Sequence, residues 1–449
     1  MYGLVGLEKL KFPDECFPFD INECTEKILR PKGNKKLYRN NAWVNCPDAN
    51  TPRVERESKV CAVFNSIGES IMRAGGLGKE LIRKWTSRFA PPVPHDGSTR
   101  RLYIVLMNTT YVNVPRDQFD WLRVLGETGL DDGGTTYDEE NNTQLIFGAQ
   151  PDRRFVLGLS LDDAELTLYV FNRGCVLTSD TFDIHQQPER LIRILAGFMF
   201  ASREFLGFDK KMELTRVDGR LFTKVTINNN TYDIKQVLHT ENVLHGRATV
   251  CLRVTRDGRT YVVKSSWVDM SYRLNEHDIL QKVKGISNVT QMVEYECVKL
   301  DTGIADSTVV DIEQFMMSNQ LTGDQIRQFK EVDNLQQVRV VLSPFGRPLR
   351  MFKSIRELFG VFLDTVEGEL ESARPQTYTD NQTAIEQLHE KKILHQDISL
   401  GNVLITDEEE EGLEGRGLLI DFDRAVWLVL NGRPATLNRA VIFSVSTLI

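Results

Sequence analysis

The chain has 449 residues, of which 41% are hydrophobic and 26% charged, which is the composition of an ordinary globular protein with two or three domains. Its formal net charge of −8 argues against a surface that coats nucleic acid, so no nucleic-acid partner is expected. Its seven cysteines form no C-x-x-C pair, which suggests neither a disulfide framework nor a zinc site.

The sequence suggests neither a secretory signal nor a membrane-spanning segment. The N-terminal stretch MYGLVGLEKLKFPDE lacks the apolar core of a signal peptide. No uncharged apolar run in the sequence approaches the ~18 residues that would span a membrane. We therefore expect an intracellular protein with no membrane partner, and cytoplasm and nucleus are not distinguished.

The first part of the chain, residues 1–95, is polar and broken by Pro and Gly, with one predicted helix from Ser58 to about Phe89 that Gly75-Gly76 interrupts. An αβ region follows over residues 96–212. Two β-rich runs, 155–161 and 165–171, predict a hairpin. Residues 188–200 predict a helix with a proline in its first turn and an apolar face, which carries Leu191, Ile194, Leu195 and Phe198.

A second region, with its own set of predicted strands and helices, begins near Leu214. Two alternating runs around an Asn triplet predict a hairpin, and so do RATVCLRV and TYVVK, whose connection contains Asp257-Gly258, a pair suited to the positive φ angles of a hairpin turn. Residues 272–283 then have a helical period near 3.6, and residues 338–342 (VRVVL) form a β-prone run.

Lys264 and Glu276 form the first candidate pair of functional residues. Lys264 ends the apolar run YVVK, so its ammonium group either reaches solvent or meets an anion. Glu276 shares a helix face with Leu280 and Val283, which points its carboxylate inward, where it needs a cation. An ion pair between the two satisfies both side chains and leaves the lysine in reach of nucleotide phosphates.

Three further polar residues follow near the end of the chain. In HQDISLGN, Asp397 is suited to accept a hydroxyl proton, and Asn402, five positions later, offers a carbonyl oxygen to Mg²⁺. Asp421, at the end of the apolar run GLLI, supplies a charged ligand for the same ion. Taken singly, Asp397 and Asn402 are also ordinary loop-capping residues, and the order of all five residues is what favours phosphate chemistry.

That order resembles the protein kinase fold. More closely, the sequence resembles the fungal-type protein kinase family, on Ile398-Ser399 after the presumed catalytic Asp and on a D-F-D motif where most kinases have D-F-G. The likeness extends upstream through AQPDRRFVLGLSL, FNRGCVLTSDTFDI and YVVKSSW, and through SPFGRPL after the presumed hinge. It covers roughly residues 145 to 430.

The resemblance implies an α+β fold with a two-lobed kinase-like domain, preceded by an αβ region. The implied N-lobe covers residues 213–342, and residues 343–449 form a partial C-lobe with the catalytic loop. ATP and Mg²⁺ are the implied cofactors, and a protein Ser/Thr hydroxyl is the implied acceptor. The site residues so assigned are catalytic Asp397, Lys264 and Glu276, cofactor-binding Gly246, Lys264, Leu342 and Ser343, and metal-binding Asn402 and Asp421.

The sequence departs from the kinase pattern in four places. Gln396 stands where an Arg is usual, and Ala248 stands where a second phosphate-loop glycine is expected. The stretches 368–381 and 407–417 interrupt the approach to the catalytic loop and the turn before Asp421. The residues after Asp421 show neither an Ala-Pro-Glu-like anchor nor amphipathic helices, so we expect a C-terminally truncated lobe and inefficient transfer to protein substrates.

Two alternatives stay open. One is a catalytically silent nucleotide-binding or scaffold module, which Gln396, Ala248 and the short C-terminal region favour. The other is a small-molecule phosphotransferase, because kinases of antibiotics and choline share H-x-D-x-x-x-x-N and also lack a Lys two residues after the Asp, where this chain has Ser399.

Overall fold

The computed structural model describes residues 4–7, 10–31, 36–48, 50–88, 104–113, 124–130, 136–217, 220–271, 276–315, 332–365, 384–406, 416–427, 429–430 and 433–434. The chain divides into two compact units, and each is built from three separate segments. The first unit comprises Met1–Leu214, Thr240–Ala248 and Lys299–Gln336, and the second comprises Thr215–His239, Thr249–Val298 and Gln337–Ile449. None of the helices in these described ranges combines the length and apolar character that a transmembrane segment needs.

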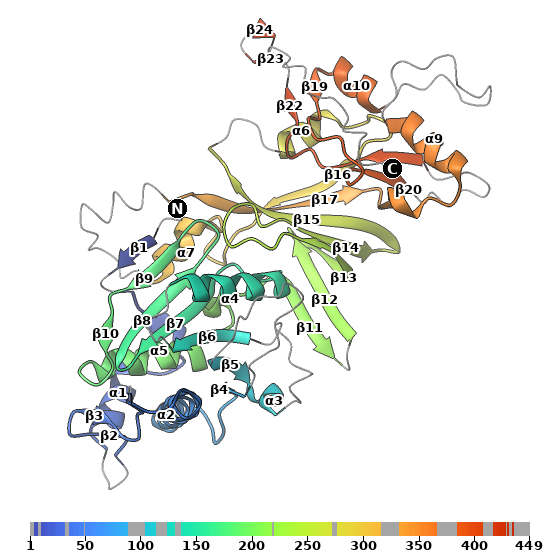
Figure 1. Ribbon diagram of the computed structural model, residues 1–449. Helices are drawn as coiled ribbons and strands as arrows, with labels where there is room; N and C mark the ends of the chain where they lie inside the picture. Colours follow the sequence, from blue (N-terminus) through green and yellow to red (C-terminus); the bar gives the residue numbers. More distant parts are fainter. Residues whose placement is uncertain are drawn as a thin grey trace. The chain divides into compact units, whose positions relative to one another are not determined.

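The first unit is built around a mixed eight-stranded sheet with the order β1-β9-β8-β7-β6-β5-β4, in which β10 pairs with β8 (Figure 1). Its strands are β1 (Leu4–Leu7), β4 (Arg83–Thr86), β5 (Ile104–Asn108), β6 (Val124–Leu130), β7 (Val156–Asp162), β8 (Glu165–Phe171), β9 (Val176–Ser179) and β10 (Phe182–Asp183). Its helices are α1 (Ile21–Leu29), α2 (Arg53–Ala74), α3 (Thr109–Val112), α4 (Thr136–Ala149), α5 (Pro188–Phe200) and α7 (Thr308–Phe315). A short ribbon, β2 (Tyr38–Arg39) with β3 (Ala42–Trp43), and the 3-10 turns η1 (Asp14–Cys16) and η4 (Glu204–Leu206) complete it.

Both faces of this sheet are buried, and the alternation along the strands explains why. Because successive side chains of a strand point to opposite faces, Ile104 and Leu106 of β5 join one apolar cluster, whereas Val105 and Met107 join another. Ile146 and Phe147 of α4 belong to that second cluster. The sheet is therefore covered on two sides, as the continuous apolar run in β5 requires.

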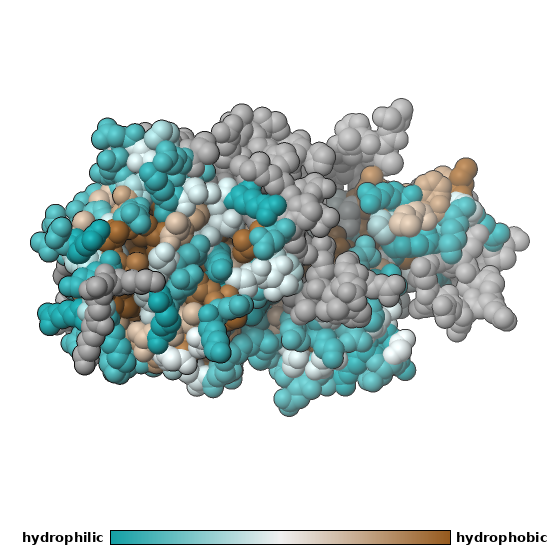
Figure 2. All heavy atoms as spheres, turned by 90° about the horizontal axis from the view of Figure 1, so that it is seen from below, coloured by the Kyte–Doolittle hydropathy of each residue, from teal (hydrophilic) through white to brown (hydrophobic). Residues whose placement is uncertain are grey.

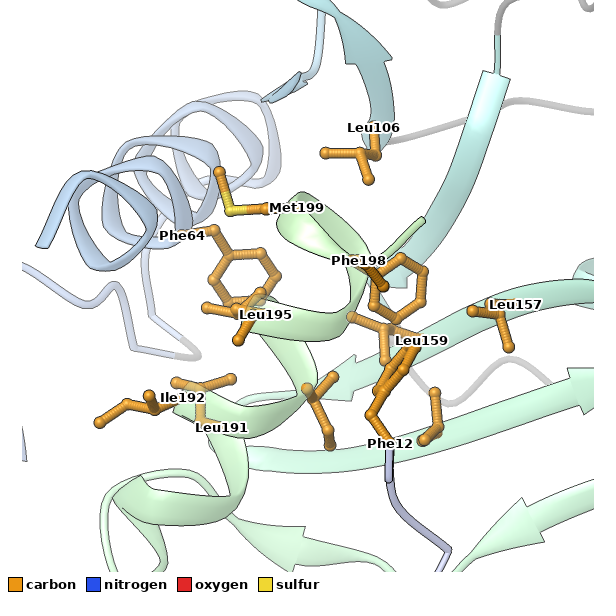
Figure 3. Packing of buried hydrophobic residues seen from close by; sticks show 14 of the residues in the cluster. Phe12, Phe64, Leu106, Leu157, Leu159, Leu191, Ile192, Leu195, Phe198 and Met199 are labelled. Atoms are coloured by element: carbon orange, nitrogen blue, oxygen red, sulfur yellow. The ribbon is translucent and has the colours of Figure 1, made fainter. Parts of the chain in front are cut away.

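Helix α5 fills the larger of the two cores. The four residues predicted to share its apolar face, Leu191, Ile194, Leu195 and Phe198, are all at most 2% exposed. Figure 3 shows α5 between α2 and the strands, with Phe198 turned toward Leu157 and Leu159 of β7. The predicted helix and the predicted hairpin of β7 and β8 are both confirmed.

The long helix predicted from Ser58 to about Phe89 is wrong in its second half. Helix α2 ends at Ala74, because Gly76 adopts φ +69°, a left-handed conformation that closes helices without strain in glycine. The N–H of Leu77 donates to the carbonyl of Met72 at 3.0 Å, which caps the last turn. The chain then enters β4, where Trp85 is 2% exposed.

A buried ion cluster joins distant segments of the first unit. Arg154 Nε lies 2.8 Å from Asp306 Oδ2, and Arg154 Nη2 also contacts Asp311 Oδ1 of α7. The three side chains are 3%, 1% and 0% exposed. Nearby, the amide of Asn172 donates to the carbonyl of Thr308 at 2.8 Å. Asp306, Thr308 and Asp311, which come from a segment that interrupts the second unit in sequence, are therefore part of the core of the first unit.

The second unit carries a seven-stranded sheet with the order β11-β12-β13-β14-β15-β17-β16. Its strands are β11 (Met212–Val217), β12 (Arg220–Ile227), β13 (Asn230–Thr240), β14 (Val250–Arg256), β15 (Arg259–Asp269), β16 (Gln291–Cys297) and β17 (Leu335–Ser343), with α6 (Glu276–Lys282) between β15 and β16. Both predicted hairpins are confirmed, β12 with β13 and β14 with β15. At the tip of the second, Asp257 and Gly258 adopt φ angles of +51° and +76°, as a two-residue hairpin turn requires.

Smaller elements complete the second unit. They are β18 (Gly346–Pro348), η5 (Leu349–Met351), α9 (Ile355–Thr365), α10 (Ala384–Glu390), β19 (Ile393–Leu394), β20 (Val403–Thr406), β21 (Arg416–Leu419), β22 (Val426–Trp427), β23 (Val429–Leu430) and β24 (Arg433–Pro434). Strands β18, β20 and β21 form one sheet, and β19 pairs with β22. One apolar cluster joins Leu280 of α6, Val361 of α9, Leu388 of α10 and Phe422.

The mixture of sheets and helices fits the expected α+β class. Figure 2 shows hydrophilic side chains over much of the coloured surface, with smaller hydrophobic patches between them, as the composition predicts. The division at residues 95, 212 and 342 stays a prediction. Of the stretches predicted as departures from the kinase pattern, residues 368–381, 407–415 and 435–449 lie outside the described residues.

Candidate active site

The β14–β15 hairpin positions Lys264. In the antiparallel register Lys264 stands opposite Cys251, and Val263 beside it is fully buried. The lysine side chain itself is only 6% exposed. A buried ammonium group is strongly disfavoured unless anions surround it. Lys264 therefore needs carboxylates or another anion nearby.

Glu276 supplies the first of these anions. It opens helix α6, whose Ile279 and Leu280 are each 1% exposed, so the helix directs this face toward the core. Glu276 Oε1 lies 2.9 Å from Lys264 Nζ, and its side chain is 8% exposed. The ion pair predicted from the inward-facing carboxylate is therefore present.

Two more carboxylates come from the D-F-D motif. Phe422 is fully buried in the apolar cluster of the second unit, and the aspartates on either side of it both reach the lysine. Asp421 Oδ1 lies 2.8 Å from Lys264 Nζ, and Asp423 Oδ2 lies 3.0 Å from it. Asp423 was not among the predicted site residues, and its only signal in the sequence was an acidic residue in place of the usual glycine.

This cluster holds more negative than positive charge. Carboxylate oxygens of Glu276, Asp421 and Asp423 lie within 4.8 Å of one another around one ammonium group. Burial raises the pKa of Glu276; Lys264 opposes this shift and Asp423 adds to it. Burial alone would lower the pKa of Lys264, but the three carboxylates raise it above its ordinary value. The lysine therefore stays charged, and the site attracts cations.

The loop that follows β19 is joined to the D-F-D segment by hydrogen bonds. His395 Nε2 donates to the carbonyl of Ile420 at 2.9 Å, and its Nδ1 accepts the N–H of Asp397 at 3.3 Å. Burial lowers the pKa of His395, which suits this neutral tautomer. The ring also meets Phe422 edge to face, with the centroids 4.8 Å apart.

Asn402 continues the same network. Its side-chain Nδ2 donates to the backbone carbonyl of Asp397 at 2.8 Å, and the backbone carbonyl of Asn402 accepts the N–H of Ile420 at 2.9 Å. The first bond orients the side chain so that Oδ1 is the atom left for a cation. Together with the bonds of His395, these contacts tie Asp397 and Asn402 to the backbone of Ile420, the residue that precedes Asp421.

Asp397 is more open than the cluster around Lys264. Its side chain is 37% exposed, and it pairs with Arg424, whose Nε lies 4.0 Å from Asp397 Oδ2. Arg424 is itself 75% exposed, so the contact is weak and screened by solvent. An accessible carboxylate held by its backbone is what a group that meets an external hydroxyl needs.

The three remaining predicted residues lie in different surroundings. Leu342, near the end of β17, is 7% exposed and pairs with Met292. Ser343 is half-buried at the end of the same strand. Gly246 belongs to the first unit, where it adopts φ +97° and its N–H donates to the carbonyl of Arg173 at 2.9 Å. Their assignment to nucleotide binding stays a prediction.

A comparison with protein families gives one match, to the family described as fungal protein kinase, over residues 104–439. The matched range contains every residue described in this site, and it covers most of the chain. The chain belongs to the fungal protein kinase family. The comparison with curated protein sequences gave no match.

Membership of the fungal protein kinase family supports a kinase as the general class of enzyme. The match includes β5 to β9 of the first unit as well as the whole site. The sequence that is typical of the family therefore extends beyond the catalytic region. At Gln396, where kinases usually carry Arg, the backbone adopts φ +63°.

Proposed function

We propose that this chain is an ATP- and Mg²⁺-dependent protein kinase that transfers the γ-phosphoryl group to a Ser or Thr hydroxyl of a protein. The observation that carries the proposal is the buried Lys264, held by both Glu276 and Asp421, beside a loop that links Asp397 and Asn402 to the same D-F-D segment. Phosphoryl transfer depends on positioning and charge stabilisation, which such an arrangement supplies.

The donor set fits a magnesium ion. Mg²⁺ prefers a few hard oxygen ligands and keeps several waters, and Asp421 with the Oδ1 atom of Asn402 offers one carboxylate and one amide oxygen. The excess of carboxylates over cations around Lys264 also favours a bound divalent cation. When bound, the ion would neutralise charge on the phosphates.

The residues of the chain then have separate tasks. Lys264, held by Glu276, donates hydrogen bonds to phosphate oxygens. Asp397 accepts the proton of the acceptor hydroxyl as the hydroxyl oxygen forms its bond to the γ-phosphorus, and the bond from that phosphorus to the β-phosphate oxygen breaks to release ADP. A two-lobed arrangement of the kinase domain, with the hinge at Leu342 and Ser343, belongs to the same proposal.

Removal of the Asp397 carboxylate tests the proposal. Asp397→Asn should lower the transfer of labelled γ-phosphate to protein acceptors by about 10²–10⁴-fold, the usual contribution of a general base. Asp278→Asn is the matched control, because Asp278 is a 43%-exposed acid of the same unit. Phosphoamino-acid analysis of the product identifies the acceptor hydroxyl. Equal transfer rates in wild type and Asp397→Asn would contradict the proposal.

The silent binding module is the second candidate, because in the structure carboxylates contact Lys264 where phosphates would have to. That candidate expects stabilisation by MgATP without any Asp397-dependent transfer. A small-molecule phosphotransferase expects Asp397-dependent transfer to an aminoglycoside or choline and none to protein. The same assay with the three acceptor classes separates these outcomes.

A further inference from the structure

Asp423 contacts Lys264 in a way that the proposed mechanism does not use. Its Oδ2 atom lies 3.0 Å from Lys264 Nζ, and its side chain is 18% exposed. Most kinases have a glycine at this position of the motif, so this third carboxylate is a feature that the general chemistry of phosphoryl transfer does not require.

The charge of the lysine is already matched by anions in this arrangement. Lys264 Nζ donates hydrogen bonds to Glu276 Oε1 at 2.9 Å and to Asp421 Oδ1 at 2.8 Å, and Asp423 Oδ2 lies 3.0 Å from it as a third anion. A phosphate that approaches Lys264 must therefore compete with these carboxylates for the same cation. The arrival of a nucleotide is thus an exchange of anions around one cation.

The three carboxylates are not equally able to leave. Glu276 is the least exposed and is fixed on α6. Asp421 and Asp423 flank the buried Phe422 and are 35% and 18% exposed, so their side chains face the open side of the cluster. A divalent cation at the carboxylate of Asp421 would neutralise charge next to Asp423 as well, because their oxygens lie within 4.8 Å.

We propose that Asp423 is a positioning residue that makes nucleotide binding depend on a divalent cation. Without the cation, the charge of Asp423 pairs with Lys264 and repels the phosphates. A bound cation would offset the charge of Asp421 and Asp423 and would leave Lys264 available to the nucleotide. This inference rests on the proposed nucleotide site, and it concerns the coupling between metal and nucleotide.

The test is the affinity for ADP, measured by calorimetry in Mg²⁺ and again in EDTA. Wild type should bind ADP far more weakly in EDTA. Asp423→Asn keeps the shape of the side chain and removes its charge, so it should reduce the Mg²⁺/EDTA affinity ratio by about tenfold or more, through tighter binding in EDTA, the direction expected when a like charge is removed at contact distance. Asp423→Gly should act in the same direction, and Asp278→Asn should keep the wild-type ratio.

Other outcomes overturn the inference. An unchanged ratio in both Asp423 variants, with melting temperatures near that of wild type, shows that Asp423 does not couple the two ligands. Weaker ADP binding in Mg²⁺ with unchanged binding in EDTA makes Asp423 an ordinary metal ligand. Failure of the proposed function has a separate signature, since wild type would then bind ADP in neither buffer, and both proposals would fall together.

Discussion

Each unit of this protein buries a cation among a surplus of carboxylates, and the two clusters differ in how they are closed. Arg154 of the first unit meets Asp306 and Asp311 with all three side chains at most 3% exposed. Lys264 of the second unit meets three carboxylates, but Asp421 among them is 35% exposed. The first cluster has no open side through which a partner could leave, whereas the second has one.

The choice of cation agrees with this difference. Arginine presents a planar fork that suits fixed carboxylates, and lysine is a point charge on a flexible stem that can exchange partners. Asp306 Oδ1 and Asp311 Oδ2 have no hydrogen-bond partner in the described part of the chain, which is costly and tolerated only where the surrounding structure imposes it. The cluster around Arg154 thus stabilises the first unit, whereas in our proposal the cluster around Lys264 exchanges its anions for a ligand.

The largest effect is expected from Arg154→Met. Removal of the cation leaves two buried carboxyl groups without their partner, and breaking a buried pair in this way typically costs about 3–5 kcal/mol. Urea unfolding followed by tryptophan fluorescence measures it, since Trp43 and Trp85 lie in the core of the first unit. A loss below that of an exposed ion pair would show that the closed cluster contributes little to stability.

Lys264→Met should act on function. Loss of one preorganised donor to a charged transition state costs about 10²–10³-fold in rate, so phosphoryl transfer should fall by that factor and stabilisation by MgATP should weaken. Lys224→Met is the control, because Lys224 is an exposed lysine on β12 of the same unit. Unchanged ATP binding in Lys264→Met would show that Lys264 does not bind the nucleotide, and the cluster around it would then have no role in ligand binding.

The pH dependence of the closed cluster is the third expected effect. Burial raises the pKa of Asp311 from 3.8 to about 8, so the folded chain keeps a proton that the unfolded chain releases. Stability from this group is complete below pH 3.8 and is lost as the pH rises to about 8, with a slope of at most about 1.4 kcal/mol per pH unit. Asp311→Asn should flatten the slope, which urea midpoints across this range would show.

The smallest effect is expected from Arg190→Met. Arg190 binds both carboxylate oxygens of Asp180 at 2.7 Å and stacks over Phe182 at 4.1 Å, but the charged side chains are 27% and 39% exposed. An exposed pair contributes about 0.2–1 kcal/mol. Comparison with Arg154→Met contrasts a partly exposed arginine that has one aspartate partner with a buried arginine of the same unit that has two. An equal loss of unfolding free energy in the two variants would show that burial of the ion cluster does not increase its contribution to stability.

Features that depend on residues close together in the chain could be predicted from the sequence. The β7–β8 hairpin, helix α5 and the turn at Asp257-Gly258 depend on neighbouring residues, and all were predicted. The pair Lys264–Glu276 spans 12 positions and was found because Glu276 lies on an apolar helix face. Pattern and spacing carry that kind of information directly.

The rest depends on contacts for which the sequence has no local signal. Arg154 and Asp311 are 157 positions apart, and neither stands out among the many charged residues. Gly75-Gly76 marked an interruption of the predicted helix, but the entry of the chain into strand β4 instead of a second helical stretch depends on the pairing of β4 with β5 and on the burial of Trp85. Asp423 was visible as a departure from D-F-G, but its contact with Lys264 required the buried placement of Phe422.

The separation of Arg154 from its partners also has a consequence for synthesis on the ribosome. At about 5–20 residues per second, the nascent chain exposes Arg154 on the order of ten seconds before Asp311 emerges. Residues 1–214 would thus have to wait, with an arginine destined for the core still hydrated, until residues 299–336 arrive. We expect a nascent chain that stops before Lys299 to be a client for chaperones, although it already contains every strand of the sheet in the first unit.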